Sequence, residues 1–528
     1  MLKNGDFMLG RDIDLYDWQR ECLNKWLGNN CRGIINVATG AGKTVLAVAA
    51  IDALSQTPDI RLKVKIIVPK IFLAGQWLKT LIDALGVKRG EIGLYYGQLK
   101  EAETRKYMIY VLNSARYSVS SHIVSDCNDN YSVLLICDEC HHFGSAENSK
   151  VFDFMPHIDI GRYYSLGLSA TPDLANPVLI QSLGGEIYKY GFDTAVKTGV
   201  VADYSVFNIS LDFQCDEADE YFELTDRINK LLAKLKKLKP HLNKYKDDRF
   251  YAELQKLASA GAGQASDYAS SALIMLYKRK EIVYLAENRI FCAEELIKKL
   301  PDNRIIVFAE RIAAVDALYD RLKRGAANVG KYHSEMGDEA RKLALLRYNS
   351  GEINILLSCR ALDEGFNVPE TDTGIIMSST GSFRQRIQRV GRVLRKTGGS
   401  GVKSIYYMYI GKSLEEREII PNNARSRTVN LRYDAAENEY FNEEYDLLCA
   451  AALKRLIKNQ TPPDVLGEVK SNFKLGSVKN DWLLPENECR AKINASGGAA
   501  EKNYWISMLK IIEERQSMID SNDVRFSE

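Results

Sequence analysis

Residues 38–44 combine glycines with a lysine and a threonine, the residue types that bind nucleotide phosphates. Glycines let the backbone N–H groups of a loop close around phosphate oxygens, and a following helix N-terminus adds a partial positive charge. Lys43 is expected to reach the β and γ phosphates, and Thr44 to hold Mg²⁺. A chance glycine-rich turn is the alternative, but the flanking patterns favour a site for ATP and Mg²⁺. Its loop residues are Thr39, Gly40, Ala41, Gly42, Lys43 and Thr44.

Asp138 and Glu139 are adjacent carboxylates that follow an apolar run in the same part of the chain. Asp138 suits Mg²⁺ coordination, directly or through a water, and Glu139 suits polarisation of a water that attacks the γ-phosphate. An acidic pair at a strand end is often merely solvated. Because this pair accompanies a phosphate loop, we favour the catalytic interpretation.

Cysteines and histidines surround this acidic pair and suggest a metal centre by their types. They are Cys137, Cys140, His141 and His142. A zinc site needs about four ligands that converge on one point. Cys137 is expected to end a strand and to point into the core, and no second cysteine pair lies nearby. We therefore do not expect zinc here.

The elements that would position these side chains are short apolar strands separated by helical patterns. Runs at residues 33–37, 64–68, 133–137 and 164–168 are apolar throughout, as expected for strands buried on both faces of a parallel sheet. A second set lies at residues 304–308, 353–358, 374–378 and 404–409. The segments between them are long enough for crossover helices, so the sequence predicts an α/β fold with two copies of one parallel-sheet architecture.

This pattern divides the chain into four predicted segments. Residues 1–205 form the first parallel-sheet domain, which binds ATP, and residues 301–412 form the second. Residues 206–300 are predicted to be a helical insertion, and residues 413–528 a mainly helical C-terminal region. Function is expected between the two α/β domains.

The composition limits the class of protein. The chain has 528 residues, of which 46% are hydrophobic and 27% charged, as in ordinary globular domains. Lys and Arg total 71 and Asp and Glu 69, so any nucleic-acid surface must be local. Ten cysteines are too sparse for a disulfide scaffold and suggest a reducing, cytoplasmic location. Neither a signal peptide nor a membrane span is expected, because long apolar runs are missing from the sequence.

The order of the motifs resembles that of superfamily 2 helicases and translocases. Besides the phosphate loop and the acidic pair, the matching segments of the first motor domain are Gln19 (the adenine-reading glutamine) and residues 68–77, 113–115 and 169–172. Those of the second motor domain are residues 306–310, 332–334, 361–369 and 388–395. The resemblance covers about residues 10–411 apart from the insertion, and it is most similar to the XPB and RadD type and to the motor subunits of restriction enzymes.

The resemblance implies two RecA-like motor domains that use ATP together. Arg392 and Arg395 would stabilise charge on the γ-phosphate, so only a closed cleft would be competent. Gly365 and Arg389 would also contact the nucleotide, although Arg389 could instead brace the domain interface through a carboxylate. Asn367 stands where family members often carry Asp, which puts the nucleotide affinity in doubt but not the hydrolytic residues.

The family also grips the backbone of one nucleic-acid strand, and its similarity to repair and restriction motors favours DNA over RNA. The contacts implied by the resemblance are Lys70, Ser114, Ser358 and Arg360. A basic run without acids, residues 230–246, adds Lys234, Lys236 and Lys237. This run would either lie along phosphates or form a solvated helix face, and the sequence leaves both open.

Together these patterns imply an ATP- and Mg²⁺-dependent DNA helicase or translocase in DNA repair or in anti-phage or restriction defence. One alternative is an RNA helicase. Another is an ATP-gated subunit of a defence or repair complex, whose partner does the cutting and binds the C-terminal region. Asp464 and Lys470 superficially resemble part of a nuclease core, but they lie too close together, so nuclease activity is not expected.

Overall fold

The computed structural model describes residues 14–38, 40–198, 200, 204–245, 247–261, 263–325, 327–359, 371–379, 403–415 and 427–520. These residues form two compact units. The first unit contains the described residues up to 200, and the second contains those from Tyr204 onward. Each unit is built around its own eight-stranded sheet, so the predicted α/β fold is confirmed.

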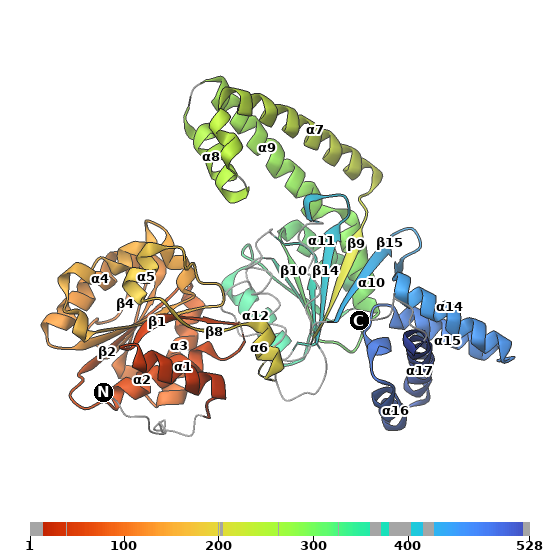
Figure 1. Ribbon diagram of the computed structural model, residues 1–528, viewed down its shortest axis with the longest axis horizontal. Coiled ribbons are helices and arrows are strands. Elements are labelled where there is room, and N and C mark those ends of the chain that lie inside the picture. Colours follow the sequence, from red (N-terminus) through yellow and green to blue (C-terminus); the bar gives the residue numbers. More distant parts are fainter. Residues whose placement is uncertain are drawn as a thin grey trace. The chain divides into compact units, whose positions relative to one another are not determined.

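The sheet of the first unit has the order β4-β3-β5-β2-β6-β7-β1-β8 (Figure 1). All neighbouring strands are parallel except β3 and β4. The strands are β1 (Arg32–Val37), β2 (Leu62–Val68), β3 (Ile92–Tyr96), β4 (Leu99–Lys100), β5 (Tyr107–Val111), β6 (Ser132–Asp138), β7 (Tyr163–Ser169) and β8 (Glu186–Tyr190). The four strands predicted in this region correspond to β1, β2, β6 and β7.

Helices cover both faces of this sheet, with α4 and α5 on one side and α1, α2 and α3 on the other (Figure 1). Their bounds are α1 (Asp17–Gly28), α2 (Lys43–Ser55), α3 (Ile71–Leu85), α4 (Leu112–Asn128), α5 (Pro177–Leu183) and α6 (Phe192–Lys197). Every residue of β2 and β5 is buried, as expected for strands covered on both faces. The burial includes Lys63 and Lys65 of β2, whose Nζ atoms lie 2.5 and 2.6 Å from the carboxylate of Asp126 on α4.

The sheet of the second unit has the order β11-β12-β10-β13-β14-β9-β15-β16, and its one antiparallel pair is β15 with β16. The strands are β9 (Tyr204–Leu211), β10 (Ile305–Ala309), β11 (Val329–Tyr332), β12 (Ile355–Cys359), β13 (Thr373–Ile376), β14 (Lys403–Ile410), β15 (Arg427–Asp434) and β16 (Glu439–Phe441). The strands predicted near residues 304, 353, 374 and 404 correspond to β10, β12, β13 and β14.

Strands β9, β15 and β16 differ from the helical segments expected around them. The predicted boundary after residue 205 falls inside β9, which pairs with β14 on one side and β15 on the other. Polar residues interrupt the apolar pattern of β9, which hid the strand from the sequence analysis. One of them, Asn208, is 1% exposed, and its Nδ2 donates to Oδ1 of Asn430 on the neighbouring strand β15 at 3.1 Å.

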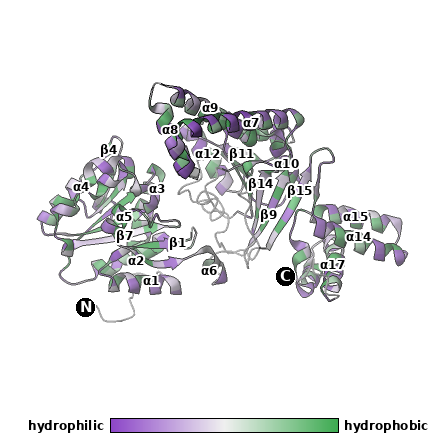
Figure 2. Cartoon of the chain, turned by 45° about the horizontal axis from the view of Figure 1, so that its top comes forward, coloured by the Kyte–Doolittle hydropathy of each residue, from purple (hydrophilic) through white to green (hydrophobic). Residues whose placement is uncertain are grey.

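The helices of the second unit fall into three groups. Helices α7 (Cys215–Leu238), α8 (Asp247–Ser259) and α9 (Gln264–Leu285) pack on one another around a small core that includes Leu235 and Leu254. Figure 2 shows many hydrophilic residues on them and hydrophobic residues along the strands. The sheet is flanked by α10 (Glu287–Lys298), α11 (Ile312–Arg324) and α12 (Asp338–Asn349). The C-terminal helices are α14 (Glu443–Lys458), α15 (Pro463–Gly476), α16 (Glu486–Ala495) and α17 (Ala499–Asp520).

Among the described residues, we find no helix with the length and apolar character needed to cross a lipid bilayer.

Candidate nucleotide site

The predicted phosphate loop and acidic pair meet at one edge of the first sheet. β1 ends at Val37, just before the loop, and β6 ends at Asp138. Strand β7 lies between them, with Ser169 opposite Asn36. The carboxyl ends of parallel strands share one edge, which is where open α/β sheets bind their ligands.

The loop adopts a conformation that suits glycine. Gly40 and Gly42 have φ angles of +85° and +98°, in the left-handed region that side chains disfavour. A Cβ atom at Gly42 would lie 2.8 Å from Nε2 of Gln19, so a side chain at this position would displace the glutamine amide. Helix α2 begins at Lys43, directly after Gly42, and Thr44 lies in its first turn. The helix N-terminus is therefore next to the loop, as anion binding requires.

Gln19 lies against the loop and is 1% exposed. Its Nε2 donates to the carbonyl oxygen of Gly42 at 3.0 Å, and its Oε1 accepts a hydrogen bond from the backbone N–H of Tyr16 at 2.9 Å. The glutamine predicted to read adenine thus joins α1 to the phosphate loop. Its contact with adenine stays a prediction.

Lys43 and Glu139 form an ion pair at the centre of the site. Their Nζ and Oε1 atoms are 3.0 Å apart, and the two side chains are 11% and 14% exposed. Glu139 has a left-handed backbone conformation with φ +49°, which is uncommon outside glycine and often marks functional positions. The pairing places the carboxylate predicted to activate water beside the lysine predicted to bind phosphate.

Asp138 is buried beside this pair, and both of its carboxylate oxygens have donors. Oδ1 accepts a hydrogen bond from the backbone N–H of Glu139, and Oδ2 accepts one from Nε1 of Trp77, each at 3.0 Å. Burial, followed by the neighbouring charge of Glu139, raises the pKa of Asp138 above its ordinary value. In the sequence, Trp77 stands out only as part of residues 68–77, a segment matched to superfamily 2 motors, and its spacing from Asp138 does not indicate a contact between them.

His141 joins the acidic segment to the end of β7. Its Nδ1 lies 2.9 Å from Oγ of Ser169, and the same oxygen accepts a hydrogen bond from the backbone N–H of Thr171 at 3.0 Å. The structure therefore connects residues 138–142 with residues 169–172, which in the resemblance match the motif that couples hydrolysis to movement. In the sequence, His141 stands out only as a possible metal ligand, and its contact with Ser169 is not indicated there.

Cys137 and Cys140 both lie in the hydrophobic core of this unit. Burial raises the pKa of both thiols, which opposes the thiolate form that binds zinc.

The predicted nucleic-acid contacts lie in several places. Lys70 is the N-cap residue of α3, at the carboxyl end of β2. Ser114 lies in the first turn of α4, and its Oγ accepts a hydrogen bond from the backbone N–H of Gly97 at 3.2 Å. Ser358 lies on β12 with 1% exposure, so its burial argues against a direct contact with a strand. The predicted residues outside the described part of the chain are Thr39, Arg360, Gly365, Arg389, Arg392 and Arg395.

The three lysines predicted on the insertion do not share one environment. Nζ of Lys234 lies 5.8 Å from the centre of the Tyr268 ring, and Nζ of Lys236 lies 5.3 Å from that of Phe250. These rings belong to α9 and α8, so both lysines also contribute to packing within the insertion. Lys237 is exposed on α7.

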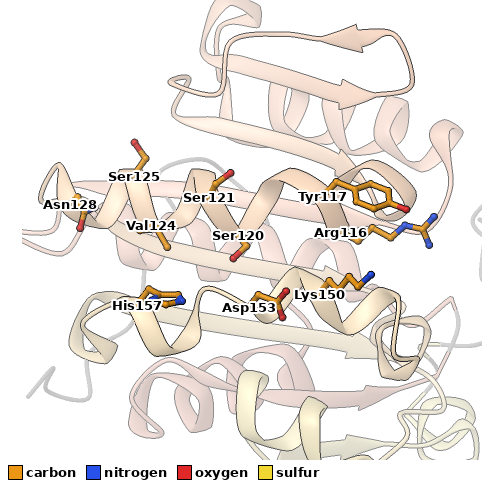
Figure 3. Close-up of a pocket in the computed structure, with 10 residues that line it drawn as sticks. All are labelled: Arg116, Tyr117, Ser120, Ser121, Val124, Ser125, Asn128, Lys150, Asp153 and His157. Carbon is orange, nitrogen blue, oxygen red and sulfur yellow. The ribbon is translucent and has the colours of Figure 1, made fainter.

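A separate groove of about 600 Å³ lies between α4 and the turns that follow the acidic pair (Figure 3). Ser120 and Val124 of α4 face a segment that carries Lys150, Asp153 and His157. Since the residues lining the groove include none from the phosphate loop, it is distinct from the nucleotide site.

Models of two protein families match the chain. "Type III restriction enzyme, res subunit" matches residues 12–174, and "Helicase conserved C-terminal domain" matches residues 288–397. The first match includes the phosphate loop, the acidic pair and Trp77. The second includes strands β10 to β13 and extends over the predicted arginines.

Individual relatives were also found. "DNA 3'-5' translocase XPB2" of Sulfurisphaera tokodaii is 26% identical over 394 residues, which cover 73% of this chain and 79% of the relative. "Putative DNA 3'-5' helicase Rad25" of Halobacterium salinarum is 22% identical over 79% of this chain and 57% of its own length. Among solved structures, the Pyrococcus furiosus Hef helicase domain is 18% identical with a TM-score of 0.47, and the match covers 76% of this chain and 96% of that one.

Proposed function

Because this chain belongs to superfamily 2 of helicases and translocases and is similar to its XPB group, we propose that it couples ATP hydrolysis to movement on DNA. The observation that carries the proposal is the meeting of Lys43, Asp138 and Glu139 at one edge of the first sheet. Both relatives described above are named as acting on DNA, which supports DNA as the substrate. We propose DNA repair as one biological role of this activity, and the match to a restriction-enzyme family adds restriction-type defence as a second.

ATP binding changes the partner of Lys43. The phosphates of ATP enter the loop between β1 and α2, where backbone N–H groups and the N-terminus of α2 stabilise their charge. Lys43 then exchanges its contact with Glu139 for one with the β and γ phosphates. Glu139 is released to accept a hydrogen bond from the water that attacks the γ-phosphate.

The residues at this edge fit Mg²⁺. The hydroxyl of Thr44 and the carboxylate of Asp138 are hard oxygen donors, and Mg²⁺ in nucleotide sites is bound by one or two such side chains together with phosphates and water. When bound, Mg²⁺ neutralises charge on the phosphate oxygens. Asp138 stays in place through its hydrogen bonds to Trp77 and to the backbone of Glu139.

Arginines that the family resemblance assigns to the second motor domain complete the proposed catalytic set. Arg392 and Arg395 stabilise the charge that develops on the γ-phosphate, so hydrolysis requires these arginines to reach the bound ATP. Gly365 and Arg389 contribute nucleotide contacts. Within the first unit, the contact between His141 and Ser169 connects the hydrolytic residues to the segment that responds to hydrolysis.

DNA binds through its backbone, so recognition does not depend on sequence. Lys70 and Ser114 contact phosphates from the first unit, where both residues follow strands at the carboxyl edge of the sheet. Arg360 contributes from the second unit. Lys237, with Lys234 and Lys236, adds positive charge on the insertion.

The test is steady-state ATPase activity without nucleic acid and then with single-stranded DNA, duplex DNA, forked DNA and RNA. Stimulation by DNA is expected, and the Lys43→Ala variant should show no turnover with any of them. Stimulation by RNA alone would refute DNA as the substrate while leaving the ATPase intact. Basal turnover that no nucleic acid stimulates would refute the proposed motor.

A further inference from the structure

Trp77 connects Asp138 to the helix that begins beside Lys70. Its indole Nε1 donates to Oδ2 of Asp138 at 3.0 Å, and the side chain is 1% exposed. Since the other carboxylate oxygen accepts a hydrogen bond from the backbone N–H of Glu139, the plane of the carboxylate is fixed from two directions. Trp77 comes from α3, an element that contributes no residue to the phosphate loop or the acidic pair.

An indole is suited to this position because it can only donate a hydrogen bond and carries no charge. A lysine or arginine at the same place would neutralise Asp138 and compete with a cation. The indole N–H occupies one lone pair of Oδ2 and leaves the negative charge available. The contact therefore orients the carboxylate while it preserves the charge that Mg²⁺ requires.

Helix α3 can transmit a displacement to Trp77. The N-cap residue of α3 is Lys70, and Trp77 follows about two turns later, roughly 10 Å along the helix axis. Leu73, Ala74 and Leu81 are buried on the same helix, so α3 is packed along its length. A DNA phosphate that binds at Lys70 therefore contacts one end of α3, and a displacement of this helix would also move Trp77 and its hydrogen bond to Asp138.

We propose that Trp77 is a positioning residue that holds the Asp138 carboxylate in its working orientation and links it to DNA binding at the start of α3. The inference rests on the proposed function, since it assigns Mg²⁺ to Asp138 and a phosphate contact to Lys70. It adds a direct path between the two sites within the first unit. This path differs from the one through His141 and Ser169, which contains neither Trp77 nor Asp138.

The molecule offers a matched control in Trp26. This tryptophan is also 1% exposed and lies in the same unit, and its Nε1 donates to the carbonyl oxygen of Ser165 at 2.9 Å. Ser165 lies within β7, away from its carboxyl end. Trp77→Phe and Trp26→Phe therefore each remove one buried indole hydrogen bond and keep an aromatic ring, but only the first changes a contact to Asp138.

The first measurement is binding of a fluorescent ATP analogue as a function of Mg²⁺ concentration, together with DNA stimulation of ATPase activity. Trp77→Phe should raise the Mg²⁺ concentration for half-maximal binding by about three- to tenfold and reduce the DNA stimulation by a similar factor, since one charge-assisted hydrogen bond is lost. Trp26→Phe should leave both unchanged. Equal losses in the two variants, or no change in Trp77→Phe, would overturn the proposal.

A second measurement does not depend on the folding of the Trp77 variant. The chain has five tryptophans, and ¹⁵N labelling of the wild-type indoles gives one N–H signal for each. Single substitutions of the other four tryptophans assign one signal each, and the signal that remains belongs to Trp77. That signal should shift when Mg²⁺ and a non-hydrolysable ATP analogue are added, and again when DNA is added. A signal that does not move with either addition would refute the link.

Different experimental results would refute the proposed function and the proposed role of Trp77. If wild-type ATPase activity is not stimulated by any nucleic acid, the motor proposal fails, and so does the link to DNA. The Mg²⁺ dependence of nucleotide binding then still tests whether Trp77 positions Asp138. If DNA stimulates the wild-type protein and Trp77→Phe equally, the motor stands and the role of Trp77 is refuted.

Discussion

Replacement of Glu139 by glutamine should tighten ATP binding while it stalls hydrolysis. In the structure, Oε1 of Glu139 holds Nζ of Lys43 at 3.0 Å, so bound phosphates must displace this carboxylate from the lysine. Glutamine keeps the shape of the side chain but removes its charge. It also removes the base that would polarise the attacking water, so the two effects on ATP run in opposite directions.

The expected gain in affinity follows from the geometry of the pair. Two unit charges 3.0 Å apart attract by about 5–6 kcal/mol at an effective dielectric constant of ~20. The two side chains are only 11% and 14% exposed, so lost hydration offsets most of this attraction and leaves the ~1.5–3 kcal/mol usual for a charged hydrogen bond. A neutral amide would still contribute ~1 kcal/mol, so about 0.5–2 kcal/mol is released, which corresponds to a roughly 2- to 30-fold lower Kd for ATP.

The assay pairs equilibrium binding of ATP with single-turnover hydrolysis. The turnover of Glu139→Gln should fall by about 10²–10⁴-fold, the contribution typical of a general base. Glu147→Gln is the matched control, because Glu147 also pairs with a lysine, Lys150, at 3.0 Å in the same unit, but with side chains that are 58% and 44% exposed. This control should change neither Kd nor turnover.

Two results would refute the reasoning about Glu139. Unchanged turnover in Glu139→Gln would remove the residue from the hydrolytic mechanism. A Kd for ATP that rises, or that falls equally in the Glu147 control, would show that displacement of the carboxylate from Lys43 does not limit binding.

Three further predictions test other parts of the molecule. Lys43→Ala should abolish hydrolysis, measured as phosphate release, and ordinary turnover would refute the phosphate-loop assignment. Asp126→Asn should lower the free energy of unfolding by about 3–5 kcal/mol in urea titrations, because Lys63 and Lys65 then lose their buried partner; the exposed Asp129→Asn should change it by less than ~0.5 kcal/mol. Substitution of Lys234, Lys236 and Lys237 by glutamine should reduce the slope of log K for DNA binding against log salt concentration by up to ~0.9 for each lysine. The control Lys256→Gln, on the same insertion, should leave the slope unchanged. An unchanged slope in the triple variant would show that this helix face is only solvated.

The positions of the strands, and of the loops that follow them, were the features that the sequence predicted best. Each apolar run that it assigned to a strand is a strand, because residues buried on both faces of a parallel sheet leave a continuous apolar pattern. The placement of Lys43 near Glu139 follows from the same pattern, since loops after parallel strands meet at one edge. The strand β9 was missed because Ser205, Asn208 and Ser210 break its apolar run. Two of these residues have partners far away in the sequence, Asn480 for Ser205 and Asn430 for Asn208.

Contacts that helices bring to the site were not predictable in the same way. Trp77 has the pattern of a buried helical residue, and only the docking of α3 on the sheet shows that its indole reaches Asp138. Gln19 was assigned to adenine by resemblance, whereas the structure reveals its hydrogen bond to Gly42. The angle at which a helix packs depends on many side chains at once, so spacing along the chain does not specify such contacts.

The protein contacts at the nucleotide site differ in whether ATP must break them. In the proposed mechanism, the pair between Lys43 and Glu139 occupies groups that the phosphates and the attacking water need, so part of the binding free energy of ATP is used to separate the pair. The hydrogen bonds from Trp77 to Asp138 and from Gln19 to Gly42 leave the loop N–H groups and the carboxylate charge available. We therefore expect ATP binding to break the Lys43–Glu139 ion pair and to keep the hydrogen bonds that Trp77 and Gln19 donate. In this proposal the ion pair changes with the nucleotide state, whereas Trp77 and Gln19 hold the surrounding groups in place.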